Sequence, residues 1–556
     1  MIDEQLAPVS SPNDPYRRPM QTWPRLSEAM IARAVPYGTV AQVARGELLF
    51  ARGEKYSDFF VVLSGAIEIL HFDERGDSHV LTVHGAREFT GELDLLSGNR
   101  NLVTARVRDD ACVLRIERAA FTAMTSAEAD IGEVVMRALI LRRMGIVEHG
   151  QAGVVLVGSR HMADVLRIRR FLLRNNYPHH LLDVDLEAEA MQLLHALDLA
   201  PRELPAVIAP GLPPLRNPTL AALSDALGLT ECVDETLVQD VTIVGAGPAG
   251  LATAVYAASE GLRTLVIEGL APGGQAGTSS RIENYLGFPT GISGHALASR
   301  AQVQAQKFGV NLLISRIAQR LRCEPEGFVI ELDDGRHVVS RSVVVATGAR
   351  YRRLDIRDYA RYEGQGIHYA ATPMEAQLCG EQQVIVVGGG NSAGQAAVYL
   401  SRVARHVHMV VRGHSLAETM SDYLVRRIDR SPSITLHTRT EIAELSGEAS
   451  LSRVTCRHRD SGAMREHDVC NLFVMIGAEP NTGWLGDRVL TDQHGFVCTG
   501  SEGTGRLRAS AYETSLPGIF AVGDVRSGSV KRVAASVGEG SVVVHAIHKH
   551  LGAGAA

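Results

Sequence analysis

Two glycine-rich turns, about 140 residues apart, constrain this 556-residue chain more than any other feature. The first lies in DVTIVGAGPAGLATAVY, where Gly245, Gly247 and Gly250 follow an apolar strand and open a helix. Gly245 permits a tight turn, Gly247 lets the backbone approach a pyrophosphate, and Gly250 lets the helix meet the strand. Glu268 ends the next strand, where its carboxylate can accept hydrogen bonds from ribose hydroxyl groups. The pattern predicts a dinucleotide site.

The second turn, in QQVIVVGGGNSAGQAAVYL, repeats this design with Gly388 and Gly390, and Ala393 stands where a third glycine would be. The next strand ends in Val411 and Arg412, so no acid is placed to accept from a 2′-hydroxyl. Arg412 could pair with a 2′-phosphate, which favours NADPH, with NADH as the alternative. The competing interpretation is that Arg412 is a solvated cation at the end of a strand.

Length and composition bound the remaining possibilities. The chain is long enough for three to five domains, and its net charge of −6 gives no general reason to expect nucleic acid or an anionic membrane as a partner. No apolar run is long enough to span a membrane, and the polar, proline-rich start lacks the apolar core of a secretory signal. We therefore expect a cytoplasmic protein. The seven cysteines include no CxxC pair and no metal-binding spacing.

From Val241 to His548 the chain resembles the thioredoxin reductase family of FAD- and NADPH-dependent homodimers. Beyond the two glycine-rich turns, its motifs GGQ, ENYLGFP, ATGA, IGAEPNT, VGDV and GEG follow in order along the chain. The resemblance implies FAD-binding residues Gly245, Gly247, Pro248, Ala249, Gly250, Glu268, Gly274, Gln275, Asn284, Ala346, Thr347, Gly348, Gly523, Asp524, Lys531, Arg532 and Val533. It implies NADPH-binding residues Gly388, Gly390, Asn391, Ser392, Ala393 and Arg412. No catalytic side chain and no metal ligand are predicted.

Departures from this family are equally informative. Its redox dithiol, C-A-T-C, would fall where this chain has Ala370 and Pro373, and a dithiol relay needs two sulfurs that can bond to each other. The arginine pair of the NADPH site is reduced to Arg412 followed by Gly413, and an Arg-Gln pair near the C-terminus becomes Lys531 and Arg532. The sequence therefore predicts hydride transfer to flavin without an internal disulfide.

The N-terminal part resembles two further families. Alternating apolar stretches broken by glycines predict a β-roll similar to cyclic-nucleotide-binding domains, followed by a helix from Thr125 to Met144. The phosphate-binding cassette of that family would fall at Gly91, Glu92, Leu93 and Arg100. The arginine that neutralises the cyclic phosphate aligns with Asn101, so only Arg100 could supply the charge. Nucleotide binding and a purely dimerising or inter-domain role both remain open. No helix-turn-helix follows, which argues against a transcription regulator.

From Gly153 to Leu229 the order of strands and helices resembles a thioredoxin or glutaredoxin fold. Pro205, in LPAVI, would be the cis-proline of that family. SRHMADV replaces the redox CxxC, so we predict a scaffold or docking role, and His161 is read as a solvated loop residue.

These expectations combine into a multidomain α/β protein with a β-roll, a thioredoxin-like domain and two Rossmann-like domains. We expect a disordered or extended tail over 1–30, the β-roll over 31–150 and the thioredoxin-like domain over 151–232. The FAD-binding domain is expected at 237–352 and 478–556, and the NADPH-binding domain at 353–477.

Three functions remain open at this stage. The first is an NADPH-dependent flavin oxidoreductase that passes electrons to an unidentified small molecule or redox protein, with the N-terminal domains regulating or dimerising it. The second is a disulfide reductase that uses a remote or partner thiol, with Cys379 as the candidate, although a buried, inert thiol is the simpler reading of Cys379. The third is a sensor in which flavin or nucleotide occupancy changes domain packing.

Overall fold

The computed structural model describes residues 14–55, 57–72, 77–91, 95, 100–149, 153–209, 212–231, 233–279, 281–325, 327–363, 365–371, 373–448, 450–500 and 510–553. The chain divides into two compact units, one built mainly from residues before Val233 and the other mainly from residues after it. In the described part, no helix is both long and apolar enough to cross a membrane. The same residues contain no group of three or more side chains placed to hold a metal ion.

The β-roll is a sheet of six strands in which β1, β6, β3 and β4 lie side by side, β2 pairs with β6 and β5 with β3. The strands are β1 (Thr39–Val43), β2 (Leu48–Phe50), β3 (Phe59–Phe72), β4 (Ser78–His84), β5 (Phe89–Thr90) and β6 (Thr104–Ile116). The rings of Phe59, Phe89 and Phe121 form its fully buried centre. The helix expected from Thr125 is instead two, α4 (Arg118–Ala127) and α5 (Ala129–Glu148), because the backbone leaves helical geometry at Glu128.

The prediction of a disordered or extended tail over 1–30 is partly wrong. Residues 1–13 lie outside the described part, but short helices follow: η1 (Pro15–Arg17), α1 (Pro19–Thr22), α2 (Glu28–Ala34) and η2 (Val35–Tyr37). Tyr16 stacks on His149 of the segment after α5, with ring centroids 4.8 Å apart, and Thr22 is fully buried. Proline-rich polar composition suggested disorder, yet these tertiary contacts order the segment, which composition alone does not reveal.

The next region has the element order β7 (Val154–Val157), α6 (Ala163–Arg174), β8 (His179–Leu182), α7 (Ala188–Ala196), η3 (Pro201–Glu203), β9 (Ala206–Ile208), β10 (Leu215–Arg216), α8 (Leu220–Leu227). Its strands lie in the order β10-β9-β7-β8, with β7 parallel to β8 and antiparallel to β9. The edge strand β10 was not expected from the sequence. The Leu204–Pro205 peptide is cis, as expected for Pro205.

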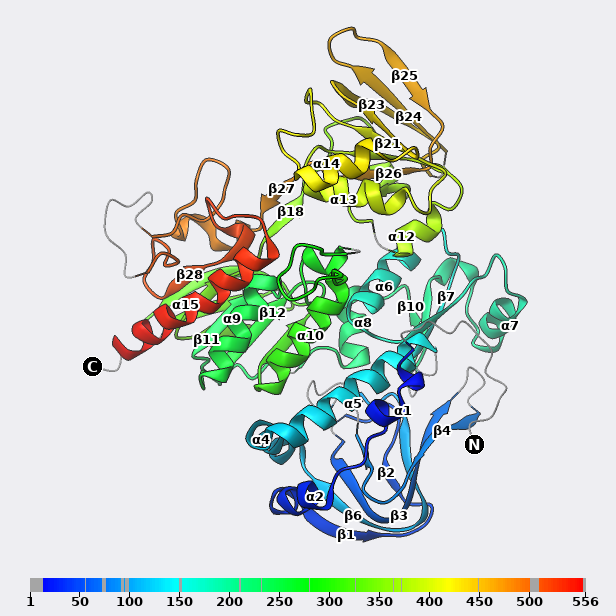
Figure 1. The fold of residues 1–556 in the computed structure, drawn as a ribbon, viewed down its shortest axis with the longest axis vertical. Coiled ribbons are helices and arrows are strands. Elements are labelled where there is room, and N and C mark those ends of the chain that lie inside the picture. The colour runs from blue at the N-terminus through cyan, green and yellow to red at the C-terminus, as the bar shows by residue number, and fades with distance from the viewer. Residues whose placement is uncertain are drawn as a thin grey trace. The chain divides into compact units, whose positions relative to one another are not determined.

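The first glycine-rich turn belongs to a parallel sheet in which β12, β11, β17 and β28 are neighbours. The elements of this region are β11 (Val241–Val244), α9 (Pro248–Ser259), β12 (Thr264–Glu268), η4 (Ala276–Thr278), α10 (Gly294–Lys307), β13 (Asn311–Ile314), β14 (Ala318–Glu324), β15 (Gly327–Leu332), β16 (His337–Ser340), β17 (Val343–Val345), η5 (Gly483–Arg488), β28 (Ile519–Ala521), η6 (Gly523–Val525) and α15 (Val533–Ala553). The long helix α15 packs along α9 (Figure 1). Every residue of β11 and β17 is buried, as in a sheet covered on both faces.

The second turn lies in another parallel sheet, ordered β19-β26-β20-β21-β22, with the antiparallel sheet β23-β24-β25 next to it in the chain. The elements are β18 (Ala349–Tyr351), α11 (Tyr359–Tyr362), β19 (Ile367–His368), α12 (Pro373–Leu378), β20 (Gln383–Val387), α13 (Asn391–Leu400), β21 (His406–Val410), α14 (Asp422–Asp429), β22 (Ile434–His437), β23 (Thr440–Ser446), β24 (Arg453–His458), β25 (Met464–His467), β26 (Asn471–Val474) and β27 (Ala478–Pro480). The short strands β18 and β27 pair with each other, so the chain enters and leaves this region through one ladder.

Candidate functional site: two dinucleotide turns

The first turn connects β11 to α9 and requires glycine at two positions. Gly245 has φ of +107°, and a Cβ atom there would lie 2.3 Å from the carbonyl oxygen of Ala346. A Cβ on Gly250 would lie 1.9 Å from the carbonyl oxygen of Gly245. At Gly247, which caps the N-terminus of α9, a Cβ would meet no protein atom. The open space in front of this helix end fits a pyrophosphate, which backbone N–H groups and the helix dipole can bind.

Glu268 lies at the end of β12, beside this turn. One carboxylate oxygen accepts from the backbone N–H of Ala246 at 2.8 Å, and the other accepts from Leu270 at 2.9 Å and Ala271 at 3.2 Å. A carboxylate has about four acceptor positions, so three amides fix its orientation and one position remains for a hydroxyl group. The arrangement fits the ribose contact expected from the sequence.

A second loop, from Gly523 to Val533, carries the remaining charged groups of the FAD set. Burial raises the pKa of Asp524, and its carboxylate makes no hydrogen bond within the described part of the chain. Lys531 and Arg532 are exposed, and Val533 begins α15. A buried carboxylate without a donor is costly unless a ligand hydroxyl supplies one. These residues therefore fit a sugar-alcohol chain with a ring near the positive end of α15.

The segment Ala346 to Gly348 follows β17 and is held by Asn481. Thr347 donates to the carbonyl of Asn481 at 2.8 Å, and the Asn481 amide donates back to the carbonyl of Thr347 at 3.0 Å. Gln275 donates its side-chain amide to the carbonyl of Ala349. Asn284 is exposed in the following loop. The structure thus brings Gln275 to the Thr347 segment.

The second turn connects β20 to α13. Gly388 has φ of +138°, and a Cβ there would lie 2.2 Å from the carbonyl oxygen of Met475, whereas Gly390 caps α13 with open space before it. Ala393 is fully buried, so alanine fills the place of the third glycine. The side-chain oxygen of Asn391 accepts from the backbone of Ser421 at 2.7 Å, and Ser392 is exposed.

Arg412 follows β21 and is exposed. It forms no ion pair with any of the residues that the structure describes, and it lowers the pKa of Glu441 only as the weakest of several basic neighbours. A guanidinium without a protein partner at this strand end fits a 2′-phosphate.

Comparison with known proteins agrees with this geometry. The family model for the pyridine nucleotide-disulphide oxidoreductases matches residues 239–540. The chain belongs to this family. The model for the cyclic nucleotide-binding domain matches residues 40–128.

Among its relatives, the thioredoxin reductase of Treponema pallidum is 34% identical over 56% of this chain and 97% of its own length. The NADPH-dependent thioredoxin reductase 3 of Arabidopsis thaliana is 32% identical over 61% of this chain and 65% of its own length. The solved thioredoxin reductase of Lactococcus lactis superposes with a TM-score of 0.52 at 27% identity, covering 56% of this chain and 98% of that one. The protein is an oxidoreductase of the thioredoxin reductase type, a family that uses FAD and NADPH.

The place of the family's dithiol lies at the start of α12. Ala370 is half-buried, Ala371 is buried, and Pro373 opens the helix. Among the described residues, every cysteine is free of a disulfide, and Cys232 lies outside that part. This member of the oxidoreductase family has no pair of sulfurs where its relatives' chemistry would need one.

Cys379 lies one residue beyond α12 and is fully buried among apolar side chains. Its thiol donates to the carbonyl of Glu375 at 3.1 Å, and burial raises its pKa to about 12. The thiolate is the reactive form, so this cysteine is held unreactive near neutral pH. The simpler reading, a buried apolar cysteine, is confirmed.

The expected phosphate cassette of the β-roll is only partly described, since Glu92 and Leu93 lie outside the described residues. Arg100 donates to the carbonyl oxygens of Gly53 at 2.7 Å and Ala226 at 3.2 Å. Asn101 is 2% exposed and accepts from the hydroxyl of Ser57 at 3.0 Å. Both side chains are committed to the protein itself.

Sequence reasoning missed Asn481 and Glu539, although both lie in motifs that it quoted. Glu539, on α15, accepts from the backbone N–H of Gly523 at 2.6 Å and pairs with Arg526 at 2.7 Å. It thereby holds the loop that carries Asp524. A buried acid inside an otherwise apolar helix was the available signal.

Proposed function

We propose that this chain is an NADPH-dependent flavin oxidoreductase that delivers electrons directly from reduced FAD to an acceptor outside the reductase module. FAD supplies a centre that takes two electrons and releases them one or two at a time. The observation that carries the proposal is the replacement of the dithiol by Ala370 and Pro373. Without two sulfurs able to form and break a mutual bond, no internal disulfide can pass the electrons on.

The residues of the chain have defined roles in this reaction. Gly247 and the N-terminus of α9 bind the FAD pyrophosphate, and Glu268 and Asp524 accept from its hydroxyl groups. Gly390 and Arg412 orient NADPH. With both cofactors held by these residues, NADPH would give up a hydride and leave as NADP⁺, and bound FAD would supply the centre that takes this hydride with a proton and passes both electrons to the acceptor.

Anaerobic mixing of the purified holoprotein with NADPH tests the first half-reaction. We expect fast loss of the flavin's visible absorbance, followed by recovery when a competent acceptor is added. A screen of quinones, ferric complexes, ferredoxin and thioredoxin identifies the class of acceptor. Persistence of oxidised flavin with both cofactors bound would overturn the proposal and favour the sensor.

A second candidate is a thioredoxin-disulfide reductase that borrows a thiol from a remote segment or a partner. The likeness to two thioredoxin reductases supports it. Disulfide reduction by the purified chain, abolished by replacing Cys379 with serine, would favour this candidate over the first.

For the N-terminal domains we propose inter-domain docking rather than recognition of a cyclic phosphate. Arg100 points to the carbonyl of Ala226 in the last turn of α8, where a helix carries partial negative charge. Arg118 pairs with Glu231 at 3.3 Å, and Arg52 donates to the carbonyl of Gly153 at 3.0 Å. The thioredoxin-like region serves as the docked scaffold, since it lacks the CxxC of redox members.

We also propose a homodimer, as the family resemblance implies. Sedimentation or light scattering of the holoprotein checks the oligomeric state, and a monomer at micromolar concentration would contradict it.

A further inference from the structure

The β-roll encloses a pocket that the proposed reductase chemistry does not use. Its wall is formed by apolar strand residues that include Phe50, Ile69 and Val103, and by α5 through Leu139, Arg142 and Ile146. Its remaining side is formed by two aromatic side chains, Tyr16 and Trp23, which come from outside the matched domain. The N-terminal segment of the same chain therefore covers one side of the pocket.

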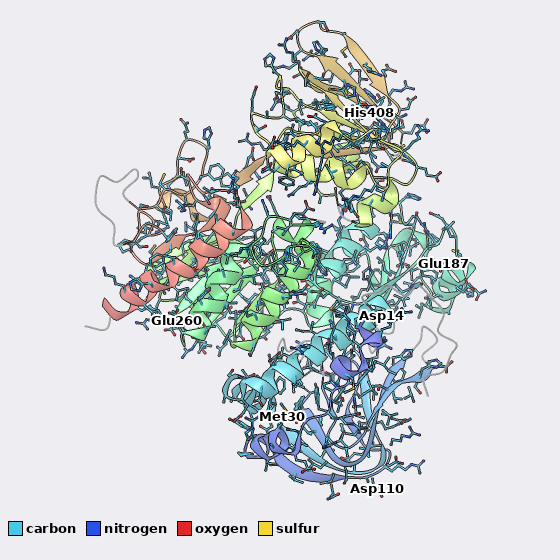
Figure 2. All side chains as sticks on the ribbon, in the orientation of Figure 1. Asp14, Met30, Asp110, Glu187, Glu260 and His408 are labelled. Atoms are coloured by element: carbon cyan, nitrogen blue, oxygen red, sulfur yellow. The ribbon has the colours of Figure 1, made fainter. Side chains whose placement is uncertain are left out.

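This closing segment, residues 14–23, is attached at several points. Tyr16 lies flat against α5 at Gly145, where an added Cβ would come within 2.1 Å of the ring. Asp14, labelled in Figure 2, forms a hydrogen bond with the ring of His149, which directly follows α5; the two atoms are 3.1 Å apart. Arg142 donates through Nε to the carbonyl oxygen of Thr22 at 2.9 Å. The attachment is mostly aromatic and polar.

With the segment in place, the remaining cavity is small. Its volume is about 40 Å³, which holds a few water molecules. Pockets for small ligands are about 300 Å³ or more. A ligand with a ring can enter only where the rings of Tyr16 and Trp23 now lie.

The pocket also contains buried nitrogen atoms that make no hydrogen bond within the described part of the chain. The Nη2 atom of Arg142 is shielded from water and has no acceptor, while its Nη1 donates to the carbonyl of Phe89 at 3.0 Å. His84, 1% exposed, presents an Nδ1 without a hydrogen bond, 3.6 Å from a carboxylate oxygen of Glu88. A buried guanidinium nitrogen without an acceptor is costly, and an anionic group on a ligand would remove that cost.

We infer that residues 14–23 are a removable plug in a ligand pocket of the β-roll, and that the ligand carries an aromatic ring and an anionic group bound by Arg142. The plug shows what the pocket accepts: two aromatic rings and one carbonyl oxygen facing the guanidinium. Arg100 and Asn101 do not take part, since their side chains bind other groups of the protein. Ligand entry and release of the N-terminal segment are then one coupled event.

The probe for this inference is 8-anilinonaphthalene-1-sulfonate, which combines aromatic rings with a sulfonate. Its fluorescence is titrated with the full chain, with Y16A/W23A, and with M20A, a control at an 85% exposed side chain of the same segment. We expect Y16A/W23A to bind the probe about tenfold more tightly or better, and M20A to behave like the unmodified chain. Equal affinity for the probe in the unmodified chain, Y16A/W23A and M20A would contradict the inference that residues 14–23 act as a plug.

The recognition group is tested in the opened Y16A/W23A chain. Adding Arg142→Gln should weaken probe binding about tenfold, while Arg137→Gln, an exposed arginine on the same helix, should not. Arg142→Lys keeps a charge but has fewer hydrogen-bond donors, so its affinity for the probe should lie between those of the Y16A/W23A chain with Arg142 and with Arg142→Gln. Unchanged affinity for the probe in both Arg142 variants, with normal circular dichroism and flavin content, would show that Arg142 does not bind the anionic group.

Release of the plug is observable directly, because the chain has only two tryptophans, Trp23 and Trp484. Trp484 is buried and its indole N–H has no hydrogen-bond partner among the described residues, so Trp484→Phe removes none of the hydrogen bonds seen there. In this variant we expect the probe to shift Trp23 emission to the red and to increase its quenching by acrylamide. Probe binding without either change would contradict coupling. Competition by cyclic AMP or by indole-3-acetate then distinguishes a nucleotide from an aromatic acid.

Discussion

The two glycine-rich turns share one backbone design and differ in the residue that follows the second strand. After β12, three amides hold the carboxylate of Glu268 beside the turn, whereas after β21 the guanidinium of Arg412 is exposed and pairs with no described residue. In both turns, the space in front of the helix N-terminus is free of protein atoms and fits a pyrophosphate. We therefore propose that the backbone of each turn provides for a dinucleotide, and that one side chain selects which dinucleotide binds.

The largest effect should come from adding volume at the first turn. Gly250→Val places carbon atoms where even a Cβ would lie 1.9 Å from the carbonyl of Gly245, so the turn cannot keep its shape. We expect purified G250V to contain no FAD by absorbance. The comparison variant is Gly390→Ala in the second turn, where the Cβ meets no protein atom; it should keep FAD and lose NADPH affinity. Full flavin content in G250V would contradict the turn geometry.

Removing the charge at the second turn should have the next largest effect. Arg412→Ala loses a charge-assisted contact worth about 1.5–3 kcal/mol, so KM for NADPH should rise about 10- to 100-fold. KM for NADH should not change, since NADH lacks the 2′-phosphate. Arg402→Ala, an exposed arginine just beyond α13, serves as the control. Equal losses with both nucleotides would mean that Arg412 does not read the 2′-phosphate.

Acid should unfold the NADPH-binding region through a cluster of three histidines, His408 on β21 (labelled in Figure 2), His437 on β22 and His467 on β25. His408 lies 3.1 Å from His437 and its ring centre 4.5 Å from that of His467. Burial, with neighbouring histidines and Arg465, lowers the pKa of His408 to about 3 and of His437 to about 4, from 6.5. These folded-state values are depressed, so the stability they contribute is complete above about pH 6.5 and is lost as pH falls toward 4.

Replacing His437 with glutamine removes one group whose protonation favours the unfolded state. The pH at the midpoint of acid unfolding, measured by circular dichroism, should therefore be lower in this variant. His458→Gln, outside the cluster and bonded to Ser461, is the matched control. A midpoint that is the same in both variants would show that the cluster does not govern acid stability.

The smallest effect is expected at Cys379. Cys379→Ser keeps a donor for the carbonyl of Glu375 and should leave NADPH oxidation within about twofold, with a small loss of thermal stability from burying a hydroxyl group. Cys470→Ser, at an exposed site, should change neither quantity. Loss of turnover in C379S alone would revive the disulfide mechanism.

Much of the reductase could be predicted from sequence because glycine positions report backbone geometry directly. Gly245 and Gly388 have the positive φ values that a tight turn requires, and Glu268 lies beside its turn as expected. The sequence could not show which polar groups the protein itself satisfies. Arg100 looked available for a phosphate, but it is bound to the carbonyls of Gly53 and Ala226, a partnership between residues far apart in the chain.

The same reason explains the misjudged N-terminus. Local composition between Asp14 and Trp23 is polar and proline-rich, and its order depends on α5, more than a hundred residues later. Sequence patterns with short periods carry no information about such contacts. Asn481 and Glu539 were missed similarly, because each acts through a backbone group distant in sequence.

The ladder between β18 and β27 has a practical consequence for protein engineering. Because Ala349 faces Pro480 and Tyr351 faces Ala478, the two ends of the intervening chain are adjacent, at the roughly 5 Å spacing of paired strands. A segment with neighbouring ends can be transplanted as a cassette without stretching its host. The part of this protein that selects the reductant could thus be exchanged for one of another specificity, leaving the flavin-binding host chain intact.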